Sequence, residues 1–234
     1  MNRKSLPFTS RLTKGQAIAA LVYLPVHVVL LPLAATFLML RGLLDETQAN
    51  LLCYMLGVVY MLVFLWKFFR RDFDALWDHP WACVREVLVC YGLMWCCNFI
   101  VNGIMLLLGM GDNPNNQALF GMAGMTFGPI AAMAVFMAPI VEECMFRAGI
   151  FGTLRRYSRW GAYLVATLAF SFYHVWSYAL VDPVYWLYFI QYVPVSLLLC
   201  RVYERTNSIW GSIFFHMLVN YIAMNALKVL ETLL

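Results

Sequence analysis

The sequence predicts an all-α fold, a polytopic membrane helix bundle of about seven transmembrane helices. The first observation is the composition: 63% of the 234 residues are hydrophobic and only 12% are charged, about half the charged fraction of an ordinary soluble domain. The second is the spacing of the charges, which leaves long segments without Asp, Glu, Lys or Arg. The third is the unequal distribution of Lys and Arg between the two ends of the expected helices. A soluble fold is excluded by the three together.

Seven charge-free runs are each long enough to cross a bilayer, for which ~18 consecutive apolar residues mark a candidate. They cover residues 15–40, 47–66, 87–111, 113–141, 160–181, 183–200 and 206–227. One such run would be compatible with a buried helix of a soluble core, but seven are not. We therefore expect residues 1–234 to form a single integral membrane domain.

The basic residues predict the orientation of this domain. If the runs are successive helices, fourteen Lys and Arg residues fall on one side, and only Arg41 and Lys228 fall on the other. The positive-inside rule then places the N-terminus in the cytoplasm. The net charge of +4 reports this topology, so the expected surroundings are a lipid bilayer and no nucleic-acid partner is expected.

Two features of the first half of the chain carry further expectations. The run 15–40 is longer than the core of a signal peptide and contains Pro25 and Pro32, which predicts a retained, kinked helix. In the connection 70–85, apolar residues alternate at helical spacing with acidic ones, including Asp72. This pattern is typical of a short helix lying in the cytoplasmic interface.

On the outer side, residues 109–117 read GMGDNPNNQ, a turn-rich loop. The fourth run that follows contains Gly121, Gly124 and Gly128, a small-residue face that predicts close packing against another helix. Aromatic residues on both sides of Asp182 predict an outer aromatic belt at a helix hairpin.

Three ionisable side chains interrupt the apolar stretch that continues beyond the fourth run. They are Glu142, Glu143 and Arg147, and the basic segment RRYSR comes only after a further apolar stretch. Each would cost ~2.5–3.5 kcal/mol at the centre of a membrane helix. Two interpretations remain open: the helix ends near Ile140 and the charges are interfacial, or the helix continues and buries them.

Two histidines favour the second interpretation. His174 lies in the middle of the fifth run and His216 inside the seventh, whereas His27 in the first run is expected only to pack. Counted from the nearest basic residue at the cytoplasmic end, Glu142, His174 and His216 lie ~20, ~22 and ~16 Å deep at 1.5 Å per residue. Three helices therefore bring polar groups to nearly one level.

Spacing within each helix suggests how these groups divide their roles. Glu143 and Arg147 are four residues apart and share a face, so they form a pair that offsets their burial. Glu142 points about 100° away from that face and is free to act as a base. Pro139 removes a backbone hydrogen bond just before the pair, which opens the helix locally.

His216 and Asn220 are also four residues apart on one helix. Side chains at this spacing lie one above the other, so both are expected to donate hydrogen bonds to a single point. Two such donors suit the oxyanion of a tetrahedral intermediate.

These residues resemble the motifs of a known family. EECMFR at 142–147 matches EExxxR, Phe170 and His174 match FxxxH, and His216 and Asn220 match HxxxN. Their order and separation resemble the CAAX protease and bacteriocin-processing (CPBP, or Abi) family of intramembrane proteases. The resemblance covers about residues 119–225. Seven expected spans are one fewer than the eight of better-known members.

The resemblance implies an intramembrane endopeptidase of the glutamate type, with no cofactor and no catalytic metal. Glu142 and His174 would activate a water, and His216 and Asn220 would form the oxyanion hole. Glu143, Arg147 and Phe170 would support them. The implied partner is a membrane-associated peptide or protein, and the implied location is a multi-pass position in a bacterial plasma membrane. Some members cleave after a prenylated cysteine, but no such preference can be read from these residues.

Two alternatives stay open. Glu142, His174 and His216 are residue types that bind Zn²⁺ and would leave its fourth position for water, although the HExxH motif is missing. Metal analysis and activity after chelation distinguish this alternative. In the second alternative, the chain is a membrane scaffold or bacteriocin immunity protein without catalytic activity. Whether Glu142→Gln abolishes the cellular phenotype distinguishes this alternative from an enzyme.

Overall fold

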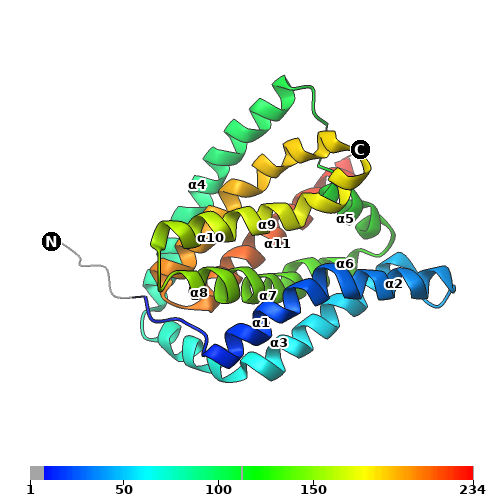
Figure 1. Ribbon diagram of the computed structural model, residues 1–234. Helices are drawn as coiled ribbons and strands as arrows, with labels where there is room; N and C mark the ends of the chain where they lie inside the picture. Colours follow the sequence, from blue (N-terminus) through cyan, green and yellow to red (C-terminus); the bar gives the residue numbers. More distant parts are fainter. Residues whose placement is uncertain (1–7, 112, 234) are drawn as a thin grey trace.

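The computed structural model describes residues 8–111 and 113–233, with side chains up to Ala226, and this part of the chain contains helices but no strand. Figure 1 shows the long helices packed side by side, with α4 inclined away from the others. The elements in chain order are α1 (Lys14–Pro25), η1 (Val26–Leu30), α2 (Leu31–Leu40), α3 (Glu46–Trp77), α4 (Pro80–Leu107), α5 (Pro114–Met125), α6 (Phe127–Ala132), η2 (Met133–Met137), α7 (Ala138–Glu142), η3 (Glu143–Phe151), α8 (Gly152–Leu154), α9 (Arg159–Val181), η4 (Pro183–Tyr188), α10 (Phe189–Thr206) and α11 (Ile209–Leu233).

Within the described residues, six helical stretches are long and apolar enough to cross a membrane, so the predicted polytopic all-α bundle is confirmed. They correspond to the first six expected runs. The seventh run corresponds to α11, which is 25 residues long but is not among the six. Polar side chains inside α11, including His216 and Asn220, lower its apolar character. The six are Lys14–Leu40, Glu46–Trp77, Pro80–Leu107, Phe127–Leu154, Arg159–Val181 and Pro183–Thr206.

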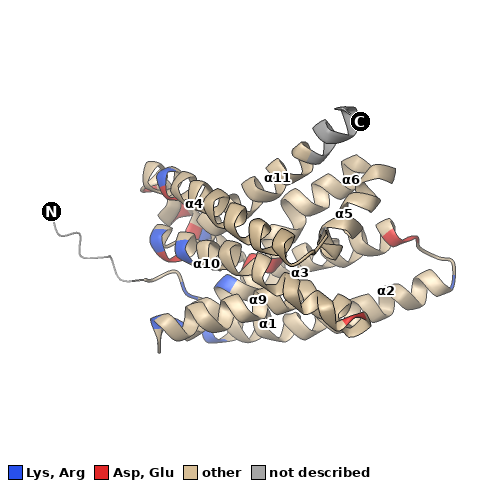
Figure 2. Ribbon diagram, turned by 90° about the horizontal axis from the view of Figure 1, so that it is seen from above, with Lys and Arg blue, Asp and Glu red and all other residues tan. Residues whose placement is uncertain are grey.

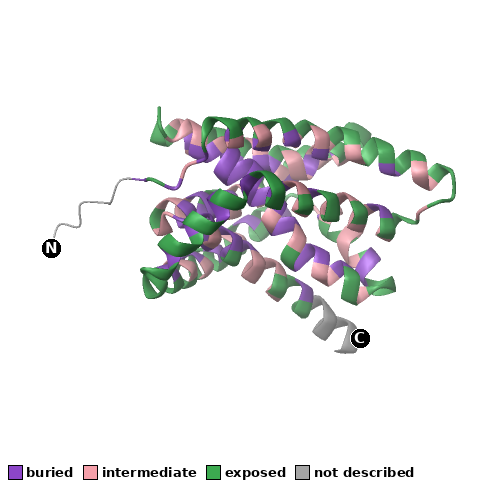
Figure 3. Cartoon of the chain, turned by 90° about the horizontal axis from the view of Figure 1, so that it is seen from below, coloured by how far each residue is buried: buried purple, intermediate pink, exposed green. Residues whose placement is uncertain are grey.

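The stretch Phe127–Leu154 is the central helix of the bundle. Of its most apolar window, 67% is buried inside the protein, against 33% or less for the other five spans. The other helices surround it and turn their exposed apolar faces outward, where lipid would cover them (Figure 3). Charged residues of this helix are therefore enclosed by protein, and the helix does not end near Ile140.

The central helix begins later than the sequence predicts. Residues 113–141 do not form one helix, because α5 ends at Met125 and the backbone turns at Thr126 before α6 starts. The expected close packing on Gly121, Gly124 and Gly128 is also wrong. A Cβ added at any of the three would meet no atom within 4 Å. These glycines face open space rather than another helix.

The first span is continuous through its two prolines. α1 runs to Pro25, a π-helical turn η1 follows, and α2 begins just before Pro32. A π-helical turn is a common way to absorb a disturbed hydrogen-bond pattern within a helix. The irregularity expected from the prolines therefore takes the form of this π-helical turn. His27 lies within the turn.

The expected interfacial helix over 70–85 is absent. The end of α3 and the start of α4 divide these residues between them, with a short turn at Asp78 and His79. Asp72, expected on a polar outer face, is 1% exposed. Its carboxylate accepts hydrogen bonds from the Ser10 hydroxyl and, at 2.9 Å, from the Ile209 amide. Asp72 is buried because it connects α3 to the segment before α1, through Ser10, and to the start of α11, through Ile209.

This junction fixes where α11 starts. The Ser208 hydroxyl donates to the Asp72 carbonyl at 2.7 Å, and Asn207 adopts the left-handed conformation that ends α10. The Asn207 side chain also accepts from the amides of Thr9 and Ser10. Because α11 carries His216 about two turns further on, the junction helps to set the position of that imidazole.

Most Lys and Arg residues of the described chain gather at one end of the bundle, where α1 begins (Figure 2). Several are paired there: Glu204 accepts from Arg155 at 2.6 Å and from Arg159 at 2.7 Å, and Glu86 accepts from Arg201 at 2.7 Å. The separation of charge that the sequence predicts along the helices is therefore present. Placement of this end in the cytoplasm stays a prediction.

Candidate active site

Glu142 lies at the end of α7, in the middle of the central helix, and is 3% exposed. Its Oε1 accepts a hydrogen bond from the Tyr54 hydroxyl at 3.1 Å. Its Oε2 is buried and has no hydrogen-bond partner among the described residues. This oxygen lies 3.8 Å from His174 Nε2 and 3.9 Å from His216 Nε2. Glu142 thus faces both histidines, as the common depth of the three residues predicts.

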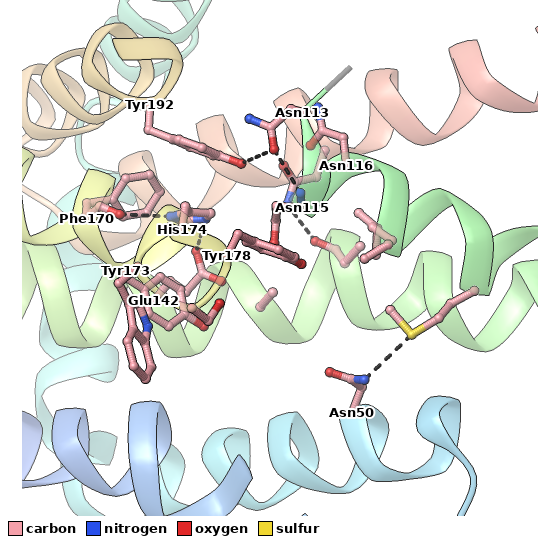
Figure 4. Close-up of a pocket in the computed structure, with 18 of the residues that line it drawn as sticks. Asn50, Asn113, Asn115, Asn116, Glu142, Phe170, Tyr173, His174, Tyr178 and Tyr192 are labelled. Atoms are coloured by element: carbon pink, nitrogen blue, oxygen red, sulfur yellow. Dashed lines mark hydrogen bonds and ion pairs between the residues drawn. The ribbon is translucent and has the colours of Figure 1, made fainter. Parts of the chain in front are cut away.

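His174 is held on α9 by contacts on both sides of its ring. Its Nδ1 lies 2.9 Å from the Phe170 carbonyl oxygen. Because a carbonyl only accepts, Nδ1 carries the hydrogen and Nε2 keeps its lone pair when the ring is neutral. The ring also stacks on Tyr192, with centroids 4.4 Å apart. In Figure 4, His174 and Glu142 point toward each other from neighbouring helices.

His216 is bound to the second glutamate. Its Nδ1 lies 2.9 Å from Glu143 Oε1, so the ring donates from Nδ1 to a carboxylate and turns Nε2 toward Glu142. The Ser212 hydroxyl donates to the other oxygen of Glu143. A carboxylate that orients a histidine in this way fixes its tautomer and the direction of its ring. This contact joins α11 to the central helix.

Arg147 balances the charge of Glu143. The two side chains are fully buried, with Arg147 Nη1 3.2 Å from Glu143 Oε1, so the pair expected from their spacing is present. Arg147 also donates to the Ser196 hydroxyl at 3.0 Å, and its guanidinium lies 4.1 Å from the centroid of the Phe170 ring. Phe170 therefore contacts two site residues. Its ring packs against the Arg147 guanidinium, and its carbonyl oxygen accepts from the His174 ring.

Asn220 lies near these groups but is engaged elsewhere. Its Nδ2 donates to the Ala134 carbonyl oxygen at 2.7 Å. His216, in contrast, directs its Nε2 at Glu142. His216 and Asn220 are expected from the sequence to donate to a single point, but in the structure their side chains are directed at different groups. Asn220 does line the same cavity as His216, with one amide hydrogen left for a further partner.

Sequence reasoning missed a chain of hydrogen bonds that reaches Glu142 from the first two spans. The Tyr54 hydroxyl, which donates to Glu142, lies 3.1 Å from the Tyr173 hydroxyl. The Tyr173 hydroxyl in turn lies 3.3 Å from His27 Nε2. His27, expected only to pack, is therefore connected to the site. No motif marks Tyr54 or His27, and only their depth in the spans could have indicated them.

A cavity of about 1310 Å³ opens onto the site. Glu142, His174, His216 and Asn220 line it together with side chains from α2, α3, α4, α5 and α10. It is large enough for a peptide segment, because ligand cavities for small molecules measure roughly 300–1,000 Å³. The cavity thus reaches a carboxylate that is otherwise enclosed by helices.

When both imidazole rings are neutral, Glu142 Oε2, His174 Nε2 and His216 Nε2 are all hydrogen-bond acceptors, and they face one another. Separations of 3.8 and 3.9 Å are too long for direct hydrogen bonds. Such separations suit one bridging water, which donates one hydrogen to Glu142 Oε2 and the other to an imidazole nitrogen. Among the described residues, no group of three His, Cys, Asp or Glu is arranged as a metal site. The zinc alternative stays a separate prediction for experiment.

Comparison with known proteins agrees with the motifs. Residues 124–222 match the model of a family described as type II CAAX prenyl endopeptidase Rce1-like. The predicted resemblance to CAAX proteases is thereby confirmed, and at the level of the family it supports an intramembrane endopeptidase of the CAAX type. All the motif residues fall within the match, whereas Tyr54 and His27 lie outside it.

A curated relative is the UPF0177 protein YbdI of Lactococcus lactis subsp. lactis (strain IL1403). It is 24% identical over 174 residues, which cover 67% of this chain and 88% of the relative. No solved structure matches the chain. With the six apolar spans, these similarities indicate a multi-pass membrane protein of the protease type.

Proposed function

We propose that this protein is a metal-independent intramembrane endopeptidase in which Glu142 and His174 activate a water that hydrolyses a peptide bond. The observation that carries the proposal is the buried Glu142 oxygen facing two imidazole nitrogens at the end of a large cavity. The match to a family of CAAX endopeptidases supports it independently.

The charges of the cluster support one reactive protonation state. Glu142, Glu143 and Arg147 are buried and together carry a net charge of −1 when ionised. One additional proton makes the cluster neutral, which lowers the cost of burying it. The proposed mechanism requires that proton on His216, whose Nδ1 donates to Glu143. Glu142 then remains ionised as the base, while His216 Nε2 becomes a donor.

The reaction follows from this state. Water bound between Glu142 and His174 gives a proton to the Glu142 carboxylate while its oxygen attacks the carbonyl carbon of the substrate. The oxyanion of the tetrahedral intermediate accepts from His216 Nε2 and from the free amide hydrogen of Asn220. Glu142 then passes its proton to the leaving nitrogen as the C–N bond breaks. Two products result, a new carboxylate and a new amine.

Glu143 and Arg147 act in this scheme through His216. Glu143 orients the imidazole and balances its charge, and Arg147 and Ser212 hold Glu143 in place. They are positioning residues rather than catalytic ones. The two adjacent glutamates therefore differ in function because one faces the cavity and the other faces the interior of the bundle.

We propose a membrane-associated peptide or protein as the substrate, and the plasma membrane of a bacterium as the location. Comparative peptidomics tests substrate and activity together. Cells that carry wild-type protein should accumulate cleaved products that are absent from cells that carry Glu142→Ala. Products of equal abundance in both would reject hydrolysis by this site.

The alternatives predict different results in the same cells and with purified protein. If the chain is a scaffold or immunity protein, Glu142→Gln keeps the cellular phenotype. If Glu142, His174 and His216 hold zinc, purified protein contains the metal and chelation stops cleavage. In the proposed mechanism, Glu142→Gln abolishes the phenotype and chelation leaves the rate unchanged.

A further inference from the structure

A chain of side-chain hydrogen bonds connects Glu142 to the first span of the bundle. The Tyr54 hydroxyl donates to Glu142 Oε1 at 3.1 Å, and the Tyr173 hydroxyl oxygen lies 3.1 Å from that of Tyr54. His27 Nε2 lies 3.3 Å from the Tyr173 oxygen. The four side chains belong to α7, α3, α9 and η1, so four separate elements of the fold meet in this chain.

The chain of hydrogen bonds has one direction. A phenol hydroxyl carries a single hydrogen, and Tyr54 uses its hydrogen for Glu142. The hydrogen between the two tyrosine oxygens therefore belongs to Tyr173. Since Tyr173 has no second hydrogen for the imidazole, His27 Nε2 must carry one and donate it. Every donor thus points one step closer to the carboxylate.

His27 is held in the orientation that this direction requires. It lies in the π-helical turn η1, directly after Pro25, and is 5% exposed. Its ring lies between those of Tyr23 and Tyr54, with centroids 5.6 and 5.1 Å away. Its Nδ1 is buried and has no hydrogen-bond partner among the described residues, so Nε2 makes the hydrogen bond of this ring. The irregular turn of the first span therefore presents a donor to Tyr173.

The effect of the chain falls on the orientation of Glu142. With Oε1 held by Tyr54, Oε2 faces the imidazole nitrogens of His174 and His216. A rotation of the carboxylate away from the two histidines would break the bond to Tyr54. Hydrogen bonds in a chain also polarise one another, so each link strengthens the last one.

We propose that His27, Tyr173 and Tyr54 are positioning residues of the hydrolase, and that their directional hydrogen-bond chain holds Glu142 with Oε2 toward the two histidines. This inference rests on the proposed function and adds the first span to it, because His27 and Tyr54 lie outside the matched stretch 124–222. The three side chains act through the carboxylate that they orient, and none of them bonds to the substrate.

Kinetics of the full-length protein in lipid nanodiscs test the middle link. Tyr173→Phe keeps the ring and removes the hydrogen that Tyr54 accepts, so kcat should fall about three- to tenfold with KM within about twofold, as for the loss of one neutral hydrogen bond. Tyr163→Phe is the matched control on α9, because the Tyr163 hydroxyl donates to Glu204 at the basic end of the bundle. Equal kcat for the two variants overturns the inference and leaves the hydrolase standing.

A double variant tests whether Tyr173 acts through Tyr54. If it does, Tyr54→Phe/Tyr173→Phe should have the kcat of Tyr54→Phe alone within about twofold, since the second substitution removes a link that is already broken. Losses of kcat that multiply in the double variant would show that Tyr173 acts by another route, and they overturn the inference.

Two substitutions of His27 separate its hydrogen bond from its packing. His27→Met fills similar space without a donor and should lower kcat about threefold. His27→Gln places an amide donor near the position of Nε2 and should recover most of that loss. Equal losses in the two variants would mean that His27 only packs, which overturns its place in the chain.

The infrared carboxyl band of Glu142 gives a reading that does not depend on catalysis. It is obtained as the difference between spectra of each protein with and without Glu142→Gln. The band should shift in Tyr173→Phe and in His27→Met but not in Tyr163→Phe. These shifts without peptide cleavage by wild-type protein support the chain and reject the proposed function. An unshifted band in Tyr173→Phe overturns the inference, whatever the rate of cleavage.

Discussion

At the scale of single residues, the adjacent glutamates differ in what surrounds their carboxylates. Glu143 is held by Arg147, Ser212 and His216, whereas one oxygen of Glu142 has no hydrogen-bond partner among the described residues. A carboxylate with both oxygens engaged by protein groups is a structural group, while one with a free buried oxygen can accept a proton from a bound water. The following two predictions test this division of roles.

The Tyr54 hydroxyl holds the other oxygen of Glu142, so Tyr54→Phe should misorient the base. A hydrogen bond to a charged group contributes ~1.5–3 kcal/mol, and its loss in the transition state should lower kcat about 10- to 100-fold with KM nearly unchanged. Steady-state kinetics of the purified variant give the answer. Tyr60→Phe is the matched control on the same helix, because the Tyr60 hydroxyl donates to the Ala19 carbonyl instead. Equal kcat for the two variants would contradict a role for Tyr54.

Arg147 neutralises Glu143 in the interior, so Arg147→Met should leave a buried charge without its partner. Breaking a buried ion pair by removing one member costs ~3–5 kcal/mol. The free energy of unfolding in detergent should fall by about that amount. The double variant Arg147→Met/Glu143→Gln should recover much of the stability but remain impaired in catalysis, because Gln cannot balance a charged His216. A single variant as stable as wild type would show that the pair contributes nothing.

At the scale of helices, the site depends on how closely α1, α3 and the central helix approach one another. Gly57 lies one turn from Tyr54 on α3. A Cβ added at Gly57 would come within 2.8 Å of the Tyr23 hydroxyl oxygen and of a Val141 methyl carbon. Such distances are shorter than van der Waals contact, so the glycine allows α3 to place Tyr54 beside Glu142.

Gly57→Ala should therefore push α3 away from its neighbours. Overpacking of this kind costs ~1–3 kcal/mol, and we expect a lower midpoint of thermal unfolding together with a reduced kcat. Gly92→Ala provides the control, because nothing lies within 4 Å of a Cβ added at that helical position. That substitution should be neutral or stabilising by about 0.5–1 kcal/mol, as expected for Ala in place of Gly in a helix. Similar results for the two alanines would rule out the close approach.

At the scale of the whole molecule, the sequence predicts the bundle well because each span must satisfy its backbone within the membrane. The charge-free runs therefore locate the helices, and the common depth of Glu142, His174 and His216 predicts their meeting. The runs do not show where a helix breaks, so the separate α5 is missed. They also carry no information on partners from other helices. For that reason the contacts of His216 with Glu143 and of Asn220 with Ala134 follow only from the packed structure.

The basic end of the bundle is predicted to face the cytoplasm. An impermeant thiol reagent applied to intact cells should label a cysteine introduced by Leu43→Cys, in the connection between α2 and α3, and should not label Tyr157→Cys at the basic end. The exposed Cys96 is replaced by Ser in both proteins. The opposite labelling pattern would invert the topology.

The most direct test of the central claim is the rate at which purified protein in proteoliposomes cleaves a membrane peptide, compared between wild type and Glu142→Gln. The substitution keeps size and the hydrogen bond from Tyr54, but it removes the base that takes the proton from water. We expect the rate to fall by about 10²–10⁴ or more, the contribution typical of a general base. Cleavage by Glu142→Gln at the wild-type rate would contradict the assignment of this carboxylate as the catalytic base.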